Sequence, residues 1–277
     1  MFTKNELTED IKAIGIDYGD VVIVHSSFKS LGKLEQGAKT VVDAIFEVIG
    51  EEGTLVFPTL CQNDWENVYK NWHLDAPSDV GYLTNYFRKL QGALRSNQAT
   101  HSVAAIGKNA EYITKTHGET GLIPGPFGDT PFAKDSPWEK LYELNAKILL
   151  VGVDPMYITL RHLAEYRVLD KNLQIAKQTD KYEEFKNELW LYENWEKGGI
   201  NAMIDPGIVF EKTGHLAKKG KIGDADCLVY STGEFVDICQ NAIERRLEGW
   251  RNKEAFEKFC DWEDRINAEL NNKKHMQ

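Results

Sequence analysis

The chain has 277 residues, of which 42% are hydrophobic and 27% are charged, a composition typical of soluble globular proteins with a sizeable core. Acidic residues outnumber basic ones by 43 to 33, and the formal net charge of −10 argues against nucleic acid or an anionic membrane as partners. The N-terminal residues MFTKNELTED lack the apolar core of a signal peptide, and no window approaches the ~18 apolar residues of a membrane span. The four cysteines are scattered, as in reducing compartments, so we expect a cytoplasmic protein.

Short apolar runs alternate with amphipathic segments along the first half of the chain. A capping box at Thr3–Glu6 opens a helix that we expect to end near Ile14. Residues 121–135 carry three glycines and three prolines, which predicts a loop. The pattern predicts, in chain order, a strand at 21–24, a helix at 38–50, a strand at 54–57, a helix at 81–90, a strand at 102–107 and a short helix at 109–116.

The second half begins with Ser136-Pro-Trp-Glu139, where a hydroxyl cap and a proline at the first helical position predict a helix start. We next expect a strand at 147–153, a helix at 158–168, and a polar insertion or small subdomain at 169–203. After it the pattern predicts a helix capped by Asp205, a strand at 227–230, a helix opened by the capping box Ser231–Glu234, and a charged C-terminal helix at 251–277. We therefore predict an α/β fold, an αβα sandwich with a mainly parallel central sheet, formed by one domain over residues 1–250.

His162 and Glu165 lie three residues apart at the start of a predicted helix, so both side chains are expected on one helix face. That helix follows a buried strand, and α/β sheets bind ligands beyond the carboxyl ends of their strands. A carboxylate that orients a neutral imidazole makes a good general base near neutral pH. The alternative is a surface ion pair without a chemical role.

Two other polar stretches adjoin predicted strands. Residues 25–32, HSSFKSLG, combine hydroxyls and loop amides with positive charge from Lys29, which suits a phosphate or a polar chain, although a serine-rich turn has the same pattern. Residues 95–102, RSNQATHS, offer Arg95 for a phosphate and Thr100 or Ser102 as hydrogen-bond donors, whereas His101 suits either a site or the start of a strand.

The sequence lacks the local motifs of several common kinds of site. His25, His101 and His162 have no metal-site spacing around them, so we expect no bound metal. The chain has no Walker A loop and no Gly-x-Ser-x-Gly elbow, which argues against that class of nucleotide site and against a serine hydrolase.

The order of these motifs along the chain resembles the aminoglycoside 3-N-acetyltransferase family. The resemblance extends over about residues 5–168 and resumes more faintly at KKGKIGDADCLVY, residues 218–230. Its motifs are VHSSFKSLG (24–32), EGTLVFPT (52–59), RSNQATHSVAAIG (95–107), DSPWEKLYEL (135–144), KILLVGV (147–153) and TLRHLAEY (159–166).

The resemblance implies an acetyl-CoA-dependent N-acetyltransferase with a small-molecule amine as its partner, and a homodimer is possible. It implies that His162 is the general base, that Glu165 is its partner, and that Thr159 belongs to the same catalytic motif. The insertion at 169–203 would flank the acceptor site. The residues implied to border the coenzyme or line the reaction centre are His25, Ser26, Ser27, Phe28, Ser30, Leu31, Gly32, Thr100, His101 and Ser102.

The sequence departs from the family pattern beside the base. Met156-Tyr157-Ile158 replaces a run that is acidic and small in family members acting on aminoglycosides, and Arg161 replaces an apolar residue. Gln98-Ala99 replaces a His-Pro pair. The acceptor amine therefore has alternatives: the 3-amino group of an aminoglycoside, or another amine such as an amino sugar. A silent coenzyme- or sugar-binding homologue is a third reading, against which the retained Thr159, His162 and Glu165 argue.

Overall fold

The computed structural model describes residues 1–61, 71–120, 131–188, 204–247, 249–250 and 252–275. The chain divides into two compact units. Unit 1 comprises Met1–Ile158 and His215–Phe235, and unit 2 comprises Thr159–Gly214 and Val236–Gln277. Among the helices of the described ranges, none is long and apolar enough to cross a membrane.

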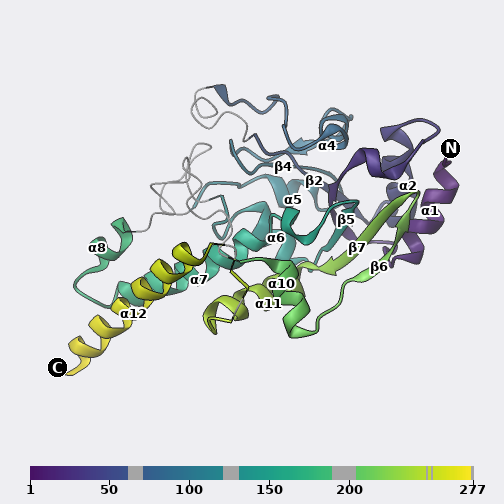
Figure 1. The fold of residues 1–277 in the computed structure, drawn as a ribbon. Coiled ribbons are helices and arrows are strands. Elements are labelled where there is room, and N and C mark those ends of the chain that lie inside the picture. Colours follow the sequence, from purple (N-terminus) through teal and green to yellow (C-terminus); the bar gives the residue numbers. More distant parts are fainter. Residues whose placement is uncertain (62–70, 121–130, 189–203, 248, 251, 276–277) are drawn as a thin grey trace. The chain divides into compact units, whose positions relative to one another are not determined.

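Unit 1 is built on a seven-stranded sheet with the strand order β3-β4-β2-β1-β5-β7-β6 (Figure 1). β1 pairs in parallel with β2 on one side and with β5 on the other. The outer pairings, β2·β4, β3·β4, β5·β7 and β6·β7, are antiparallel. The strands are β1 (Val21–Ser26), β2 (Thr54–Pro58), β3 (Leu94–Arg95), β4 (Val103–Gly107), β5 (Lys147–Val151), β6 (Lys218–Ile222) and β7 (Ala225–Ser231).

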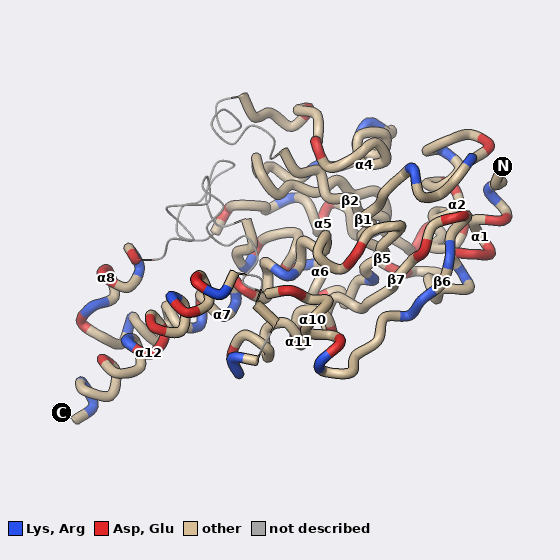
Figure 2. The backbone as a smooth tube through the Cα atoms, in the orientation of Figure 1, with Lys and Arg blue, Asp and Glu red and all other residues tan. Residues whose placement is uncertain are grey.

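The parallel centre of the sheet was predicted correctly. β1, β2 and β5 are almost entirely buried, and continuous apolar runs are typical of strands covered on both faces. Sequence reasoning missed two edge strands for different reasons. β3 has only two residues, and β6 reads KKGKI, whose three lysines are exposed and appear blue in Figure 2. Charged residues of this kind are common on edge strands and hide the alternation that identifies a strand.

Helices cover both faces of this sheet, as the αβα prediction requires. α1 (Lys4–Ala13) and α2 (Ala38–Ile49) contact each other and share one buried cluster with Val22, Val24 and Leu149 of the sheet. Alternate strand residues point to opposite faces, so Ile23 and Leu150 belong to the other face. Other helical elements in the described part of unit 1 are η1 (Phe28–Leu31), α4 (Tyr82–Phe87), α5 (Ala110–Thr114), α6 (Pro137–Glu143) and η2 (Pro155–Tyr157). α5 contacts β2, β3, β4 and α6, and its buried residues lie outside that cluster.

Side chains cap the helices where the sequence predicted caps. Thr3 and Glu6 form a reciprocal capping box at α1, and the Ser136 hydroxyl accepts from the Glu139 amide at α6. The Asp205 carboxylate accepts from the first amides of α10 (Pro206–Thr213), and the Ser231 hydroxyl accepts from the Glu234 amide at α11 (Thr232–Glu244). These bonds satisfy amides that have no partner within their helix.

Unit 2 contains α7 (Arg161–Ala176), α8 (Tyr182–Asn187), α10, most of α11 and α12 (Lys253–His275). The prediction that the α7 helix ends at residue 168 was wrong, because Val168, Asn172 and Ala176 continue its buried stripe for two more turns. The expected insertion at 169–203 therefore begins inside α7 and continues through α8, and residues 189–203 lie outside the described part of the chain. The expected C-terminal helix is α12, along which acidic and basic residues alternate (Figure 2).

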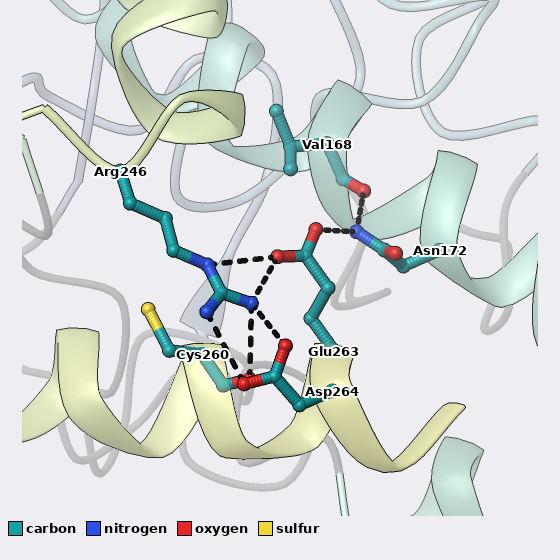
Figure 3. A network of polar contacts seen from close by, with 6 residues as sticks. All are labelled: Val168, Asn172, Arg246, Cys260, Glu263 and Asp264. Carbon is teal, nitrogen blue, oxygen red and sulfur yellow. Dashed lines mark hydrogen bonds and ion pairs between the residues drawn. The ribbon is translucent and has the colours of Figure 1, made fainter. Parts of the chain in front are cut away.

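A network around Arg246 joins the end of α11 to α12 and α7 (Figure 3). The Arg246 guanidinium donates to Glu263 at 2.9 Å and to Asp264 at 2.5 Å, and also to the Cys260 carbonyl at 3.4 Å. The other Glu263 oxygen accepts from the side-chain amide of Asn172 at 3.1 Å. Arg246 adopts a left-handed backbone conformation, with φ of 52°, which non-glycine residues rarely adopt. These contacts therefore stabilise the backbone conformation just after the C-terminal end of α11.

We expect Arg246→Met to lower the free energy of unfolding by about 1–2 kcal/mol, because it removes several charge-assisted hydrogen bonds while leaving the backbone strain. Lys258→Met is the matched control, since it removes an exposed ion pair within α12 and should cost less than about 0.5 kcal/mol. Urea denaturation of both variants measures the difference. Equal stability of the two variants would show that the network does not anchor this corner of unit 2.

Candidate active site

The first turns of α7 bring His162 and Glu165 together in unit 2. The His162 Nδ1 and a Glu165 carboxylate oxygen lie 2.8 Å apart, as expected for side chains at positions i and i+3 of a helix. Both are buried, with His162 7% exposed and Glu165 fully inaccessible. The alternative of a surface ion pair is therefore excluded.

The Glu165 carboxylate is held on both sides. Its second oxygen accepts a hydrogen bond from the backbone amide of Ile204 at 3.3 Å. Because a buried carboxylate needs partners for its lone pairs, this amide helps to hold the Glu165 carboxylate in its orientation towards His162. Nothing in the local sequence signals this contact, since Ile204 lies 39 residues farther along the chain.

The contacts of His162 determine which ring nitrogen carries the proton. The Nε of Arg161 is 3.4 Å from the His162 Nε2 and donates to it, so Nε2 is the acceptor and Nδ1–H donates to Glu165. Burial, followed by the positive charge of Arg161, holds the pKa of His162 well below its ordinary value of 6.5. The imidazole is therefore neutral at physiological pH, with the tautomer that a general base requires at Nε2.

Thr159 lies two residues before the start of α7, and its carbonyl accepts from the His162 amide at 3.0 Å. The structure thus brings Thr159, His162 and Glu165, the three predicted catalytic residues, into one short segment of unit 2. The predicted coenzyme residues all lie in unit 1.

Residues 25–32 leave the sheet through a tight turn. His25 and Ser26 belong to β1, which is two residues longer than predicted, and the 3₁₀ helix η1 begins at Phe28. The Ser27 amide donates to the carbonyl of Val151, and both the amide and the hydroxyl of Ser30 donate to the Ser27 carbonyl. Gly152 follows β5 with φ of +63°, and a Cβ there would lie 1.9 Å from the Ser30 hydroxyl oxygen. Glycine at this position therefore allows η1 to approach the end of β5.

A hollow of about 750 Å³ lies beside η1 in unit 1. Phe28 and Gly32, two of the predicted coenzyme residues, line it together with the cationic Lys29 and Lys33. Sequence reasoning missed Met1, Phe2 and Asp224, which also line the hollow. Asp224 follows a glycine in the β6–β7 turn, and its amide donates to the Leu31 carbonyl at 3.3 Å.

Thr100, His101 and Ser102 form a buried, hydrogen-bonded segment ahead of β4. The Gln98 side-chain oxygen accepts from the amides of Thr100 and His101, and the Thr100 hydroxyl lies 2.8 Å from the His101 Nδ1. The Ser102 hydroxyl lies 2.9 Å from that of Thr59, which follows β2. The carboxyl ends of β1, β2 and β5 and the amino end of the antiparallel strand β4 lie on the same side of the sheet. The predicted site residues of unit 1 therefore gather at the carboxyl ends of the parallel strands.

Arg95 links the segments at the carboxyl ends of these strands. Its Nε donates to the hydroxyls of Thr59 and Ser102, and its terminal nitrogens donate to the carbonyls of Leu74, Ala76 and Thr59. The guanidinium also stacks over the Trp72 ring at 4.6 Å. The structure therefore gives Arg95 a role in positioning these loops, in place of the phosphate contact suggested by the sequence. In the described part of the chain, no three His, Cys, Asp or Glu side chains are grouped to hold a metal ion.

Comparison with known proteins places this arrangement in a family. Residues 23–244 match the model of a family described as aminoglycoside 3-N-acetyltransferase. The chain belongs to this family. That membership confirms the resemblance identified from the motifs, from VHSSFKSLG to TLRHLAEY.

Individual relatives agree with this assignment. An SPbeta prophage-derived aminoglycoside N(3')-acetyltransferase-like protein, YokD, of Bacillus subtilis is 30% identical over 265 residues, which is 86% of this chain and 91% of the relative. Its crystal structure superposes with a TM-score of 0.61 at 25% identity, covering 87% of this chain and 98% of that one.

Two more distant structures share the fold of this family member. AAC-IIIb in binary complex with CoASH gives a TM-score of 0.65 at 19% identity, covering 91% of this chain and 99% of that one. AAC-VIa bound to sisomicin gives 0.68 at 20% identity, covering 88% and 98%.

The buried histidines of this family member predict an acid-sensitive fold. Burial lowers the pKa of His25 and of His117 to about 4, from an ordinary value of 6.5. The unfolded chain takes up protons at these imidazoles below about pH 6.5 while the folded chain does not, so stability is full above that pH and falls towards pH 4.

We expect His25→Leu to reduce this pH-dependent loss by on the order of 2 kcal/mol between about pH 6.5 and 5. The His25 Nε2 is buried without a hydrogen-bond partner among the described residues, so the substitution breaks no bond at that atom. Denaturant unfolding across this pH range measures the effect, with the exposed His73→Leu as control. Identical pH slopes for the wild type and His25→Leu would contradict the assignment.

Proposed function

We propose that the protein is an acetyl-CoA-dependent N-acetyltransferase that moves the acetyl group directly to a primary amine, with His162 as general base. The 3-amino group of an aminoglycoside is the acceptor that the family indicates. The single observation that carries this proposal is the buried pair of His162 and Glu165, 2.8 Å apart, in which the imidazole is neutral and its Nε2 accepts.

The chemistry follows from that pair. His162 Nε2 removes a proton as the amine nitrogen attacks the thioester carbonyl, and the negative charge of Glu165 stabilises the imidazolium that forms. Collapse of the tetrahedral adduct breaks the C–S bond, and the coenzyme leaves as a thiol after taking up a proton, while the amine becomes an amide. The oxyanion needs donors, for which the amides of residues 26–32 and the Thr159 hydroxyl are candidates. No residue of the chain is acylated in this sequence.

Coenzyme binding is proposed for the turn after β1. The hydroxyls of Ser26, Ser27 and Ser30 and the amides up to Gly32 are suited to a polar chain, while Lys29 and Lys33 beside the hollow match the charge of phosphate groups. AAC-IIIb, which shares the fold, was solved with CoASH, and this supports the choice of coenzyme. His25, Phe28, Leu31, Thr100, His101 and Ser102 are assigned to the same region as neighbours of the reaction centre.

The acceptor has two candidates. AAC-VIa binds sisomicin, and this supports an aminoglycoside acceptor for a protein of the same fold. A second candidate, an amine outside the aminoglycosides, is favoured by the contact of Arg161 with His162, which places a positive charge beside the base. A cytoplasmic location and a homodimer remain predictions from the sequence.

We expect His162→Ala to lower the rate of acetyl transfer by about 10²–10⁴-fold, which is the usual contribution of a general base. Coenzyme affinity should stay nearly unchanged, because His162 lies outside the residues assigned to the coenzyme. Thiol release from acetyl-CoA across a panel of aminoglycosides and amino sugars measures the rate, and calorimetry with CoA measures the affinity.

Glu165→Gln is a second test of the same mechanism. It preserves an oxygen that accepts from the His162 Nδ1–H but removes the charge that stabilises the imidazolium, so it should also lower the rate with CoA affinity preserved. His73→Ala, an exposed histidine in unit 1, is the control and should retain full activity. Wild-type turnover in His162→Ala would refute the mechanism.

A further inference from the structure

We propose that Trp250 is a positioning residue for Glu165: it holds the backbone of Ile204 where the amide of that residue reaches the carboxylate. This inference rests on the proposed acetyl transfer and adds to it a residue that none of the sequence motifs indicates. It is carried by a bridge between two segments of unit 2 that are distant in the chain.

Ile204 and Trp250 form an isolated antiparallel β-bridge. A hydrogen bond of this bridge is made by the flanking residues, since the Asp205 amide donates to the Gly249 carbonyl at 2.7 Å. In an antiparallel pair of this kind, the backbone N–H and C=O groups of the two opposed residues point away from each other. The Ile204 N–H therefore points away from Trp250, and it donates to the Glu165 carboxylate at 3.3 Å.

The Trp250 side chain anchors its half of the bridge. Its ring stacks on that of Phe256 in α12, with the ring centroids 3.7 Å apart and an interplanar angle of 11°. Side chains of directly opposed residues share one face of an antiparallel pair, so the indole lies beside the side chain of Ile204, which is fully buried. Loss of the indole therefore removes packing from both residues of the bridge.

The backbone at Gly249 is adapted to the same bridge. Gly249 has φ of +150°, and a Cβ there would lie 2.7 Å from a methyl group of Val209 in α10. Asp205, which donates to the Gly249 carbonyl, also caps α10 with its carboxylate. The bridge is thus joined to α10 through Asp205, to α12 through the stacked rings and to α7 through the Ile204 amide.

The position of the Ile204 amide affects how Glu165 meets His162. One carboxylate oxygen of Glu165 lies 2.8 Å from the His162 Nδ1, and the other accepts from Ile204. The carboxylate is planar and rigid, so a shift at one oxygen also moves the other. A misplacement of about 1 Å at a catalytic site can cost a large factor in rate. Trp250 therefore acts on the rate through Glu165.

The test compares two substitutions of Trp250. Trp250→Leu removes the stacked ring, whereas Trp250→Phe keeps one. The indole N–H is buried and has no hydrogen-bond partner within the described ranges, so Trp250→Phe breaks no hydrogen bond at that atom. We expect Trp250→Leu to lower kcat by more than about tenfold and Trp250→Phe to stay within about twofold of the wild type. The KM for acetyl-CoA should be equal in all three proteins, with thiol release as the assay.

Two further variants separate position from stability. Phe259→Leu is the matched control, because it also removes a buried ring on α12 but lies outside the bridge. It should lower the free energy of unfolding and leave kcat unchanged. Gly249→Ala disturbs the bridge from its backbone and should lower kcat as Trp250→Leu does. An equal loss of kcat in Phe259→Leu and Trp250→Leu would show a general loosening of unit 2 and overturn the inference.

A double-mutant cycle shows whether Trp250 acts through Glu165. In the Glu165→Ala background the carboxylate is absent, so adding Trp250→Leu should lower kcat by less than about a further twofold. Losses that multiply in the double variant would mean that Trp250 acts by another route, and the positioning role would be refuted.

The His162 Nδ1–H proton provides a readout that needs no turnover. A hydrogen bond to a carboxylate moves the NMR resonance of such a proton downfield, and its absence in His162→Ala assigns the signal. The resonance should be shifted or lost in Trp250→Leu and retained in Trp250→Phe. An unchanged resonance in Trp250→Leu overturns the role of Trp250, whether or not an amine is acetylated. Failure of every amine to release thiol overturns the proposed function, while the resonance still reports on Trp250.

Discussion

The hydrogen bond between the His162 Nδ1–H and the Glu165 carboxylate is the interaction on which the rest of the site depends. Burial alone would leave a neutral imidazole with no defined tautomer, and a buried carboxylate alone would be costly. Together they assign the proton to Nδ1 and leave Nε2 as the acceptor. The Ile204 amide completes the arrangement by holding the other Glu165 oxygen, so three groups from two distant parts of unit 2 establish one proton position.

The two units of the chain carry different groups of the predicted site residues. In unit 1, the parallel strands end on the same side of the sheet, where serine hydroxyls and loop amides lie near a hollow lined by Lys29, Lys33 and Asp224. Arg95 stabilises this arrangement by donating to neutral oxygens of Thr59, Leu74 and Ser102, which belong to three segments. In unit 2, the start of α7 carries His162 and Glu165. The residues proposed for the coenzyme and those proposed for proton transfer therefore belong to different units of the chain.

The sequence predicted the features that follow from local periodicity. The pairing of His162 with Glu165 depends only on helix geometry, and the parallel centre depends on continuous apolar runs. Features that depend on distant residues were not predictable: the Ile204 amide lies 39 residues from Glu165, and Asp224 reaches the hollow through a hairpin whose first strand is rich in lysine. The contact between Arg161 and Nε2 depends on a side-chain rotamer, which no sequence pattern specifies.

The lysines of β6 have a consequence for assembly. The strand lies at the outer edge of the seven-stranded sheet, where β7 is its hydrogen-bonded neighbour among the described strands. Lys218, Lys219 and Lys221 are exposed along it, and lysines on an edge strand disfavour pairing with a strand from another chain. These lysines therefore act against extension of the sheet at this edge.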